Sequence, residues 1–141
     1  MPSLCKILAN SDFLIKDVDN MQRGEVMLSN FPSGAGYRTS IYYGQCVDNG
    51  GNFRKFDYGK AANMALYGQE TPPDIPIEAI DMPIAIFNGS LDPIVPEADV
   101  NYLIERLGAN VIYHKVIVGD HWTFSMAQDM SWFKEDLIQV L

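Results

Sequence analysis

The sequence predicts an α/β fold, and three consecutive segments in the second half of the chain carry this prediction. Residues 83–87 form a continuous apolar run that ends at Asn88-Gly89, which is typical of a strand buried on both faces. Residues 97–107 have the periodicity of an amphipathic helix, and residues 111–118 are again rich in β-branched side chains. A strand, a helix and a second strand in this order predict a parallel βαβ unit.

The predicted helices of this half have clear ends and apolar faces. The first places its apolar side chains three and four positions apart, at Val100, Leu103, Ile104 and Leu107. Pro96 suits its first turn, Glu97 complements the helix dipole, and Gly108 ends it. A closing helix is expected to be capped by Asp129 and to pack one face against the sheet, formed by Met130, Phe133, Leu137 and Val140 or Leu141.

The first half of the chain lacks this sheet pattern and is expected to be loosely helical. Short helices are predicted at residues 3–9 and 21–30, and a longer one at residues 37–47. Residues 52–59 are predicted to be extended, and the Gly and Pro residues of 60–81 argue against a long regular element there. A sheet has about five or six strands on average, whereas only two are predicted here. This chain is therefore expected to be the later part of a larger fold.

Composition limits the possible classes of function. The chain has 141 residues, of which 48% are hydrophobic, and this is enough for one domain with a core. The net charge is −8 with ten Lys and Arg residues, which argues against a nucleic-acid partner and against an anionic membrane surface. No apolar stretch approaches the roughly 20 residues of a transmembrane helix. The first 15 residues are too short and too interrupted for a signal peptide.

An acid and an imidazole follow the two predicted strands. Asp92 comes just after the first strand and His121 just after the second. The carboxyl ends of parallel strands share one edge of a sheet, where sites are commonly built. Asp followed by His is also the latter part of the order Ser, Asp, His, in which the carboxylate fixes the tautomer of the imidazole and the imidazole moves a proton for a serine. The pair therefore predicts a place in a nucleophilic hydrolase.

Each of these residues also has a plain structural interpretation. Asp before Pro is common in turns, and a single His in a polar and aromatic loop is often structural. His114 lies within a predicted strand and is expected to line a face. No His or Cys spacing typical of a metal site occurs, so neither a metal nor another cofactor is expected. Cys5 and Cys46 either pair in an oxidising compartment or stay buried as small apolar side chains.

Taken together, short motifs from about Asn20 to Leu141 resemble the acid lipases of the gastric and lysosomal type, within the α/β-hydrolase superfamily. The resemblance rests on the order and spacing of Pro32-Ser33-Gly34, Phe56-Asp57-Tyr58-Gly59, Tyr67-Gly68-Gln69, Pro72-Pro73, residues 82–89, Asp92, Asp99-Val100, Ile112-Tyr113-His114-Lys115 and His121-Trp122-Thr123-Phe124.

This resemblance implies a partial α/β-hydrolase fold, made of the last two parallel strands with their helices. Residues 1–59 would then be the helical end of a cap or lid, and residues 60–141 the C-terminal segment of the core. The family places its catalytic acid at Asp92 and its histidine at His121. Trp122 and Phe124 would wall an acyl pocket, the alternative being aromatic packing in the core. The substrate implied is a lipid ester, triacylglycerol or steryl ester, and the setting is secretory, lysosomal or extracellular.

Three departures qualify the resemblance. The family usually has two glycines where this chain has Gly89-Ser90, and an acid where this chain has Thr123. No Gly-x-Ser-x-Gly nucleophile motif occurs, and the nearest approach, residues 32–36, follows no predicted strand. The family's serine would belong to strands upstream of Met1, and without it the acid and the base have nothing to activate.

Two hypotheses follow from these observations. In the first, the chain is the C-terminal fragment of a lipase or carboxylic ester hydrolase, which supplies Asp92 and His121, lacks the serine and is inactive alone. Its partner would be the missing N-terminal half. In the second, the chain is a non-catalytic binding or structural component derived from a hydrolase, with another protein covering its exposed sheet edges.

Overall fold

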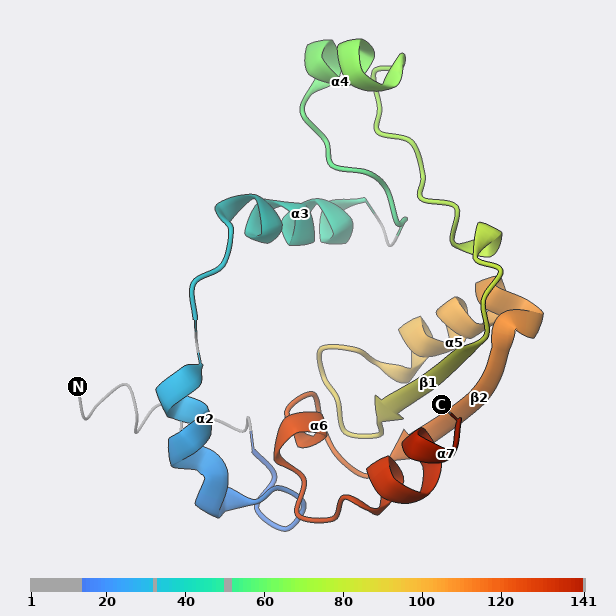
Figure 1. Ribbon diagram of the computed structural model, residues 1–141. Coiled ribbons are helices and arrows are strands. Elements are labelled where there is room, and N and C mark those ends of the chain that lie inside the picture. Colours follow the sequence, from blue (N-terminus) through green and yellow to red (C-terminus); the bar gives the residue numbers. More distant parts are fainter. Residues whose placement is uncertain (1–13, 32, 50–51, 141) are drawn as a thin grey trace. The chain divides into compact units, whose positions relative to one another are not determined.

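A computed structural model describes residues 14–31, 33–49 and 52–140, and over these ranges it is a mixed α/β structure, as predicted (Figure 1). The elements in chain order are η1 (Met21–Arg23), α2 (Gly24–Asn30), α3 (Tyr37–Asp48), α4 (Lys60–Tyr67), η2 (Ile77–Ala79), β1 (Ile84–Gly89), α5 (Glu97–Leu107), η3 (Gly108–Asn110), β2 (Val111–Ile117), α6 (Thr123–Met126), η4 (Trp132–Leu137) and α7 (Ile138–Val140). The helix expected at residues 3–9 lies outside the described residues.

The chain divides into two units, which are described separately. One unit comprises Met1–Pro32 and Glu78–Leu141, and the other comprises Ser33–Ile77. Both strands belong to the first unit, whereas α3 and α4 belong to the second. The boundary at residue 59 expected from the sequence refers to the cap and the core of a larger fold, and it stays a prediction.

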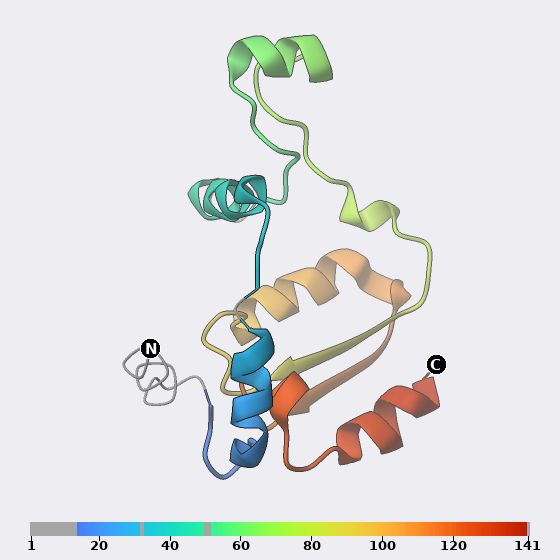
Figure 2. The same cartoon turned by 60° about the vertical axis from the view of Figure 1, so that its left-hand side comes forward.

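The βαβ unit predicted from the sequence is present in the first unit. β1 pairs with β2 in parallel, from Ile84 opposite Val111 to Gly89 opposite Ile117. α5 connects them and lies along one side of the two strands, while the closing helical segment lies along the other (Figures 1 and 2). The apolar face of α5 is buried at Val100 and Leu107. The sequence locates this unit well because its periodicity and its end signals are local.

The expectation that the first strand is buried on both faces was wrong for the described residues. β1 is only half-buried from Ile84 to Phe87 and becomes fully buried at Asn88 and Gly89. β2 alternates between half-buried and exposed side chains. A parallel strand is buried on both faces only when layers cover it and neighbours flank it, and β1 and β2 are the only two strands in the described part of the chain.

The closing helical segment also differs from the sequence expectation. It begins with η4, a π-helical turn, and Phe133 is 39% exposed instead of facing the sheet. Trp132 takes this place, because its ring lies 5.9 Å from that of Phe87 and 5.5 Å from that of Phe124. Asp129 does accept hydrogen bonds from the backbone and the hydroxyl of Ser131, as a capping residue would. One turn of π-helix shifts which side chain reaches the sheet.

The second unit contains a helix that the sequence interpretation missed. α4 spans Lys60–Tyr67 and ends at Gly68, whose φ of 74° is the left-handed conformation typical of a helix end. Residues 53–55 run antiparallel to residues 73–75, with Lys55 N–H donating to Pro73 and Ile75 N–H donating to Phe53. α3 spans Tyr37–Asp48 and confirms the helix predicted at residues 37–47.

Among the described residues of the second unit, Asn63 of α4 is a fully buried polar residue. Its Nδ2 donates to Asp57 Oδ1 at 2.7 Å and to the Glu70 carbonyl at 2.9 Å, and its Oδ1 accepts the Tyr58 N–H at 2.9 Å. The hydrogen bonds from Gly59 N–H and from Asn63 hold the pKa of Asp57 below its usual value. One amide therefore fixes the loop before α4 and the loop after it.

Replacing Asn63 by Ala is expected to loosen the second unit. The Tyr58 N–H and the Glu70 carbonyl lose their partner, which costs roughly 2 kcal/mol of unfolding free energy. Both tryptophans lie in the other unit, so their fluorescence does not report on this one. Hydrogen exchange at the amides of Tyr58 and Ile75 measures the loss of stability directly. Asn52→Ala removes an exposed amide and is the matched control. Equal exchange in the two variants would contradict the role given to Asn63.

Candidate active site

Asp92 lies in the loop directly after β1 and is held there by backbone donors. Its Oδ1 accepts the Ile94 N–H at 2.8 Å and the Val95 N–H at 3.0 Å, which is the turn chemistry that Asp before Pro favours. Its side chain is only 4% exposed. The turn interpretation of Asp92 is thus correct, and the turn leaves the second carboxylate oxygen free for another donor.

That donor is His121, which follows β2 at the same edge of the sheet. Its Nδ1 lies 3.1 Å from Asp92 Oδ2. The imidazole is 45% exposed, and the described residues offer no hydrogen-bond partner to its Nε2. An ionised carboxylate accepts from Nδ1–H, so it leaves Nε2 unprotonated in the neutral ring and able to take a proton.

Backbone contacts tie the two loops together. Ser90 N–H donates to Ile117 O and Leu91 N–H to Gly119 O, both at 2.9 Å. At Gly89 the strands come so close that a Cβ would lie 2.4 Å from the Gly119 carbonyl oxygen. A glycine is therefore required where the first strand ends, and the acid and the imidazole are placed by one continuous piece of hydrogen-bonded backbone.

A cavity of about 350 Å³ lies beside the Asp92–His121 pair. Its described lining residues are Phe87, Asn88, Asp92, Val95, His121 and Phe124. Phe124, one of the two predicted pocket residues, is among them, whereas the ring of Trp122 packs edge-on against Phe31 at 4.7 Å. None of the described lining residues is Ser, Thr or Cys, so this wall of the cavity offers an acid, a base and apolar surface but no nucleophile.

Sequence reasoning missed several contributors to the site. Phe87 and Asn88 line the cavity from the end of β1, and Asn88 Oδ1 bonds His114 Nε2 at 2.7 Å. His114 therefore links β2 to β1, a role close to the face-lining one predicted for it. The backbone amides of Ile94 and Val95 could have been anticipated from the Asp-Pro turn, whereas the lining residues depend on how the closing segment packs.

The electrostatic setting of Asp92 favours its ionised form. Burial works to raise the pKa of this carboxyl group, but the hydrogen bonds from Val95, Ile94 and His121 outweigh it and hold the pKa below its usual value. The Asp92 carboxylate therefore stays charged in mildly acidic solution.

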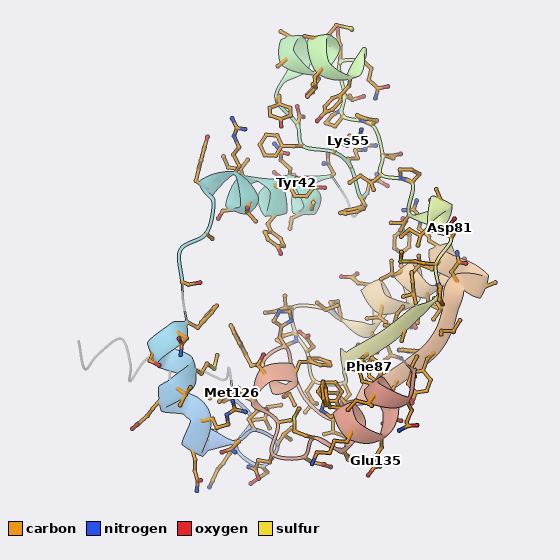
Figure 3. The ribbon with its side chains drawn as sticks, in the orientation of Figure 1. Tyr42, Lys55, Asp81, Phe87, Met126 and Glu135 are labelled. Carbon is orange, nitrogen blue, oxygen red and sulfur yellow. The ribbon has the colours of Figure 1, made fainter. Side chains whose placement is uncertain are left out.

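This lowered pKa predicts how stability depends on pH. A group whose pKa is depressed by folding stabilises the folded state above its unfolded pKa, about 3.9 for aspartate, and this contribution is lost as the pH falls through the folded value. The urea midpoint followed by Trp122 and Trp132 fluorescence is expected to fall more steeply below about pH 4 in the unmodified chain than in Asp92→Asn. Asp81→Asn, at an exposed acid, should keep the steep fall (Figure 3). If the urea midpoints of Asp92→Asn and of the unmodified chain fell in parallel with pH, the stabilising role of the Asp92 carboxylate would be refuted.

The structure also bears on cofactors and cysteines. In residues 14–31, 33–49 and 52–140 no three His, Cys, Asp or Glu side chains cluster as metal ligands would. Among the helices of the described chain, none has the length and apolar character needed to cross a membrane. Cys46 is half-buried, and its pairing with Cys5 falls outside the described residues.

Comparison with known proteins shows which of them the chain is similar to. No protein-family model matches it. It is 35% identical over 132 residues to the gastric triacylglycerol lipase of Bos taurus, a match that covers 89% of this chain and 32% of the lipase. It is 34% identical over 130 residues to lipase member K of Homo sapiens, covering 88% of this chain and 32% of that protein.

A third relative is a putative lysosomal acid lipase/cholesteryl ester hydrolase of Crotalus adamanteus, 34% identical over 99 residues, or 70% of this chain and 24% of that protein. The chain thus spans about a third or less of the length of the curated relatives it matches. The resemblance expected from its short motifs is confirmed over most of the chain. The chain is of the acid-lipase type, and it corresponds to a C-terminal part of the gastric and lysosomal lipases.

Proposed function

We propose that this chain supplies the acid and the base of a carboxylic ester hydrolase that acts on lipid esters such as triacylglycerols or steryl esters. The single observation that carries the proposal is the contact between His121 Nδ1 and Asp92 Oδ2 at 3.1 Å, beside a cavity. The relatives named as triacylglycerol lipase and cholesteryl ester hydrolase support the choice of substrate class.

In the proposed mechanism His121 is the general base and then the general acid. Its Nε2 takes the proton of a serine hydroxyl as the serine attacks the ester carbonyl, and it returns that proton to the leaving alcohol. Asp92 holds Nδ1–H and stabilises the imidazolium that forms. The acyl group is then on the serine, and water, activated by the same imidazole, releases the fatty acid.

No Gly-x-Ser-x-Gly occurs in these 141 residues, so we propose that the serine and the donors that stabilise the oxyanion lie outside them. In this proposal they come from the remainder of an α/β-hydrolase fold, in which β1 and β2 are the last two strands and are accompanied by their helices, and residues 1–59 belong to the cap. The chain alone is then inactive. Phe124 and Phe87 offer an apolar wall to the acyl chain. A secretory or lysosomal setting is proposed on the names of the gastric and lysosomal relatives.

A second candidate is a non-catalytic component that binds another protein. The observation that favours it is the exposed apolar surface along and after β2, where Ile112, Val116 and Val118 are 58%, 47% and 69% exposed. The first candidate accounts for the same surface, because the remaining strands and helices of a hydrolase would flank and cover it. Activity of a completed fold distinguishes the two.

The test is a chimaera in which this chain replaces the segment of the Bos taurus gastric lipase that it matches. Hydrolysis of a short-chain ester and of a triacylglycerol emulsion is measured for the purified chimaera. Turnover well above the uncatalysed rate supports the hydrolase, and it must vanish when the serine of the lipase portion is replaced. A folded, monodisperse chimaera without turnover favours the non-catalytic candidate.

A further inference from the structure

The loop that carries His121 is closed by two buried polar side chains, Asp120 and Thr123. Asp120 is 5% exposed and Thr123 is 1% exposed. Asp120 Oδ1 accepts the Trp122 N–H at 2.8 Å, the Thr123 N–H at 3.1 Å and the Thr123 hydroxyl at 3.2 Å. Thr123 Oγ1 in turn accepts the Asp120 N–H at 3.0 Å. The two side chains thus bond each other's backbone in both directions, as in a capping box.

His121 lies inside this closed ring of hydrogen bonds. The Gly119–Asp120 peptide is fixed through the Asp120 N–H, and the His121–Trp122 peptide is fixed through the Trp122 N–H. This hydrogen-bonded loop is also tightly packed, because a Cβ on Gly119 would lie 2.5 Å from the methyl carbon of Thr123. Gly119 O also accepts Leu91 N–H from the loop of Asp92. The same segment therefore sets where the imidazole stands and where the carboxylate stands.

We infer that Asp120 and Thr123 are positioning residues that hold His121 in the orientation in which Nδ1 faces Asp92. Neither side chain lines the cavity or touches the imidazole-binding oxygen of Asp92, so both act through the backbone of His121. The inference rests on the proposed function only for its consequence in turnover. Its structural part, the link between this pair and the tautomer of His121, stands apart from catalysis.

The expected consequence is specific for the hydroxyl of Thr123. Thr123→Val keeps the branched shape beside Gly119 but leaves the Asp120 N–H without an acceptor and Asp120 Oδ1 with two donors. Thr123→Ser keeps the hydroxyl and both hydrogen bonds. Ser125→Ala, on the exposed side of α6, is the matched control, since no described hydrogen bond uses its hydroxyl.

The first measurement is the tautomer of His121, read from its ring ¹⁵N shifts in the full 141-residue chain at a pH of about 9, where free imidazole is neutral. The chain has two histidines, and His114→Gln identifies the signals of His121. The Nδ1–H tautomer is expected to dominate in the unmodified chain, in Thr123→Ser and in Ser125→Ala. In Thr123→Val the ratio of the Nδ1–H tautomer to the Nε2–H tautomer should fall by roughly tenfold. This is the effect expected when the hydrogen bond from Nδ1–H to the Asp92 carboxylate is lost.

Amide exchange over β2 guards against a merely unfolded variant. If Thr123→Val loses protection at residues 111–117 in proportion to the change in tautomer, the pair only stabilises the fold and the inference is wrong. It is also wrong if Thr123→Val keeps the tautomer of the unmodified chain. Should Thr123→Val unfold outright, Thr123→Ala, which removes the same hydroxyl, decides. A tautomer ratio that falls in Thr123→Ala while residues 111–117 keep their protection supports the inference, whereas an unchanged ratio there, or an equal fall in Thr123→Ser, overturns it.

The chimaera supplies the second measurement and separates this inference from the proposed function. In Thr123→Val kcat should fall by about a hundredfold with little change in KM, because a displaced base weakens the transition state and leaves binding intact. If every chimaera is inactive while the order of the tautomers holds, the proposed function fails and the positioning role stands. If the chimaera is active and Thr123→Val matches it in kcat, the positioning role fails.

Discussion

In the chimaera with the Bos taurus gastric lipase, His121→Ala is expected to lower kcat by a factor on the order of a million, while KM for a short-chain ester changes little. The imidazole is the group that both removes and returns the proton, and Nδ1 is already engaged by Asp92 at 3.1 Å. No other described side chain on the cavity wall can take over, because Asp92, the other titratable group there, is 4% exposed and remains bound by two backbone donors. Steady-state hydrolysis of a soluble ester measures this loss.

His114→Gln is the matched control for that variant. His114 is the other histidine of the chain and bonds Asn88 from within β2, so its glutamine variant should keep most of the turnover. Binding and oxyanion stabilisation alone account for the small turnover that remains without a base. A His121→Ala chimaera that retains more than about a thousandth of the kcat of the unmodified chimaera would therefore mean that a different base serves the serine.

The largest expected effect on stability is that of Gly89→Ala. The new Cβ would meet the Gly119 carbonyl oxygen at 2.4 Å and its carbon at 3.0 Å, and both are backbone atoms that cannot rotate away. Relief requires the ends of β1 and β2 to separate, which strains the bonds from Ser90 and Leu91 to the second strand. Overpacking of this kind costs about 3 kcal/mol of unfolding free energy. The urea midpoint reported by Trp122 and Trp132 measures it.

Gly24→Ala tests the same chemical change where space is open. Gly24 starts α2 with helical dihedral angles, and nothing lies within 4 Å of the position of its Cβ. Alanine there should leave the midpoint unchanged or raise it slightly. If Gly89→Ala behaved like Gly24→Ala, the close approach of the two strand ends would not exist in solution.

The elements that the sequence located well are those whose signals are local. α5 has regular apolar spacing, acids in its first turn and a glycine at its end, so its bounds could be predicted to within a residue. α4 has comparable signals, since Gly59 precedes it and Gly68 follows it, but Pro72 and Pro73 argue only against a long element and do not exclude a helix of eight residues before Gly68. The burial of β1 could not be predicted, because burial depends on which other elements cover a strand.

The same division holds for the candidate site. The proximity of Asp92 and His121 follows from a general property of parallel strands, namely that their carboxyl ends share an edge. The turn that binds Asp92 follows from Asp before Pro. The ring of hydrogen bonds formed by Asp120 and Thr123 could be suspected only from their spacing of three residues.

The most direct test of the central claim is the structure of the chimaera after its serine has reacted with a phosphonate ester, which mimics the tetrahedral intermediate. The account predicts that Nε2 of His121 lies about 2.6–3.2 Å from an oxygen on the phosphorus or from the serine oxygen, with Nδ1 still bonded to Asp92. An adduct in which another side chain occupies that place, or in which His121 has left Asp92 and points away from the serine, would contradict it.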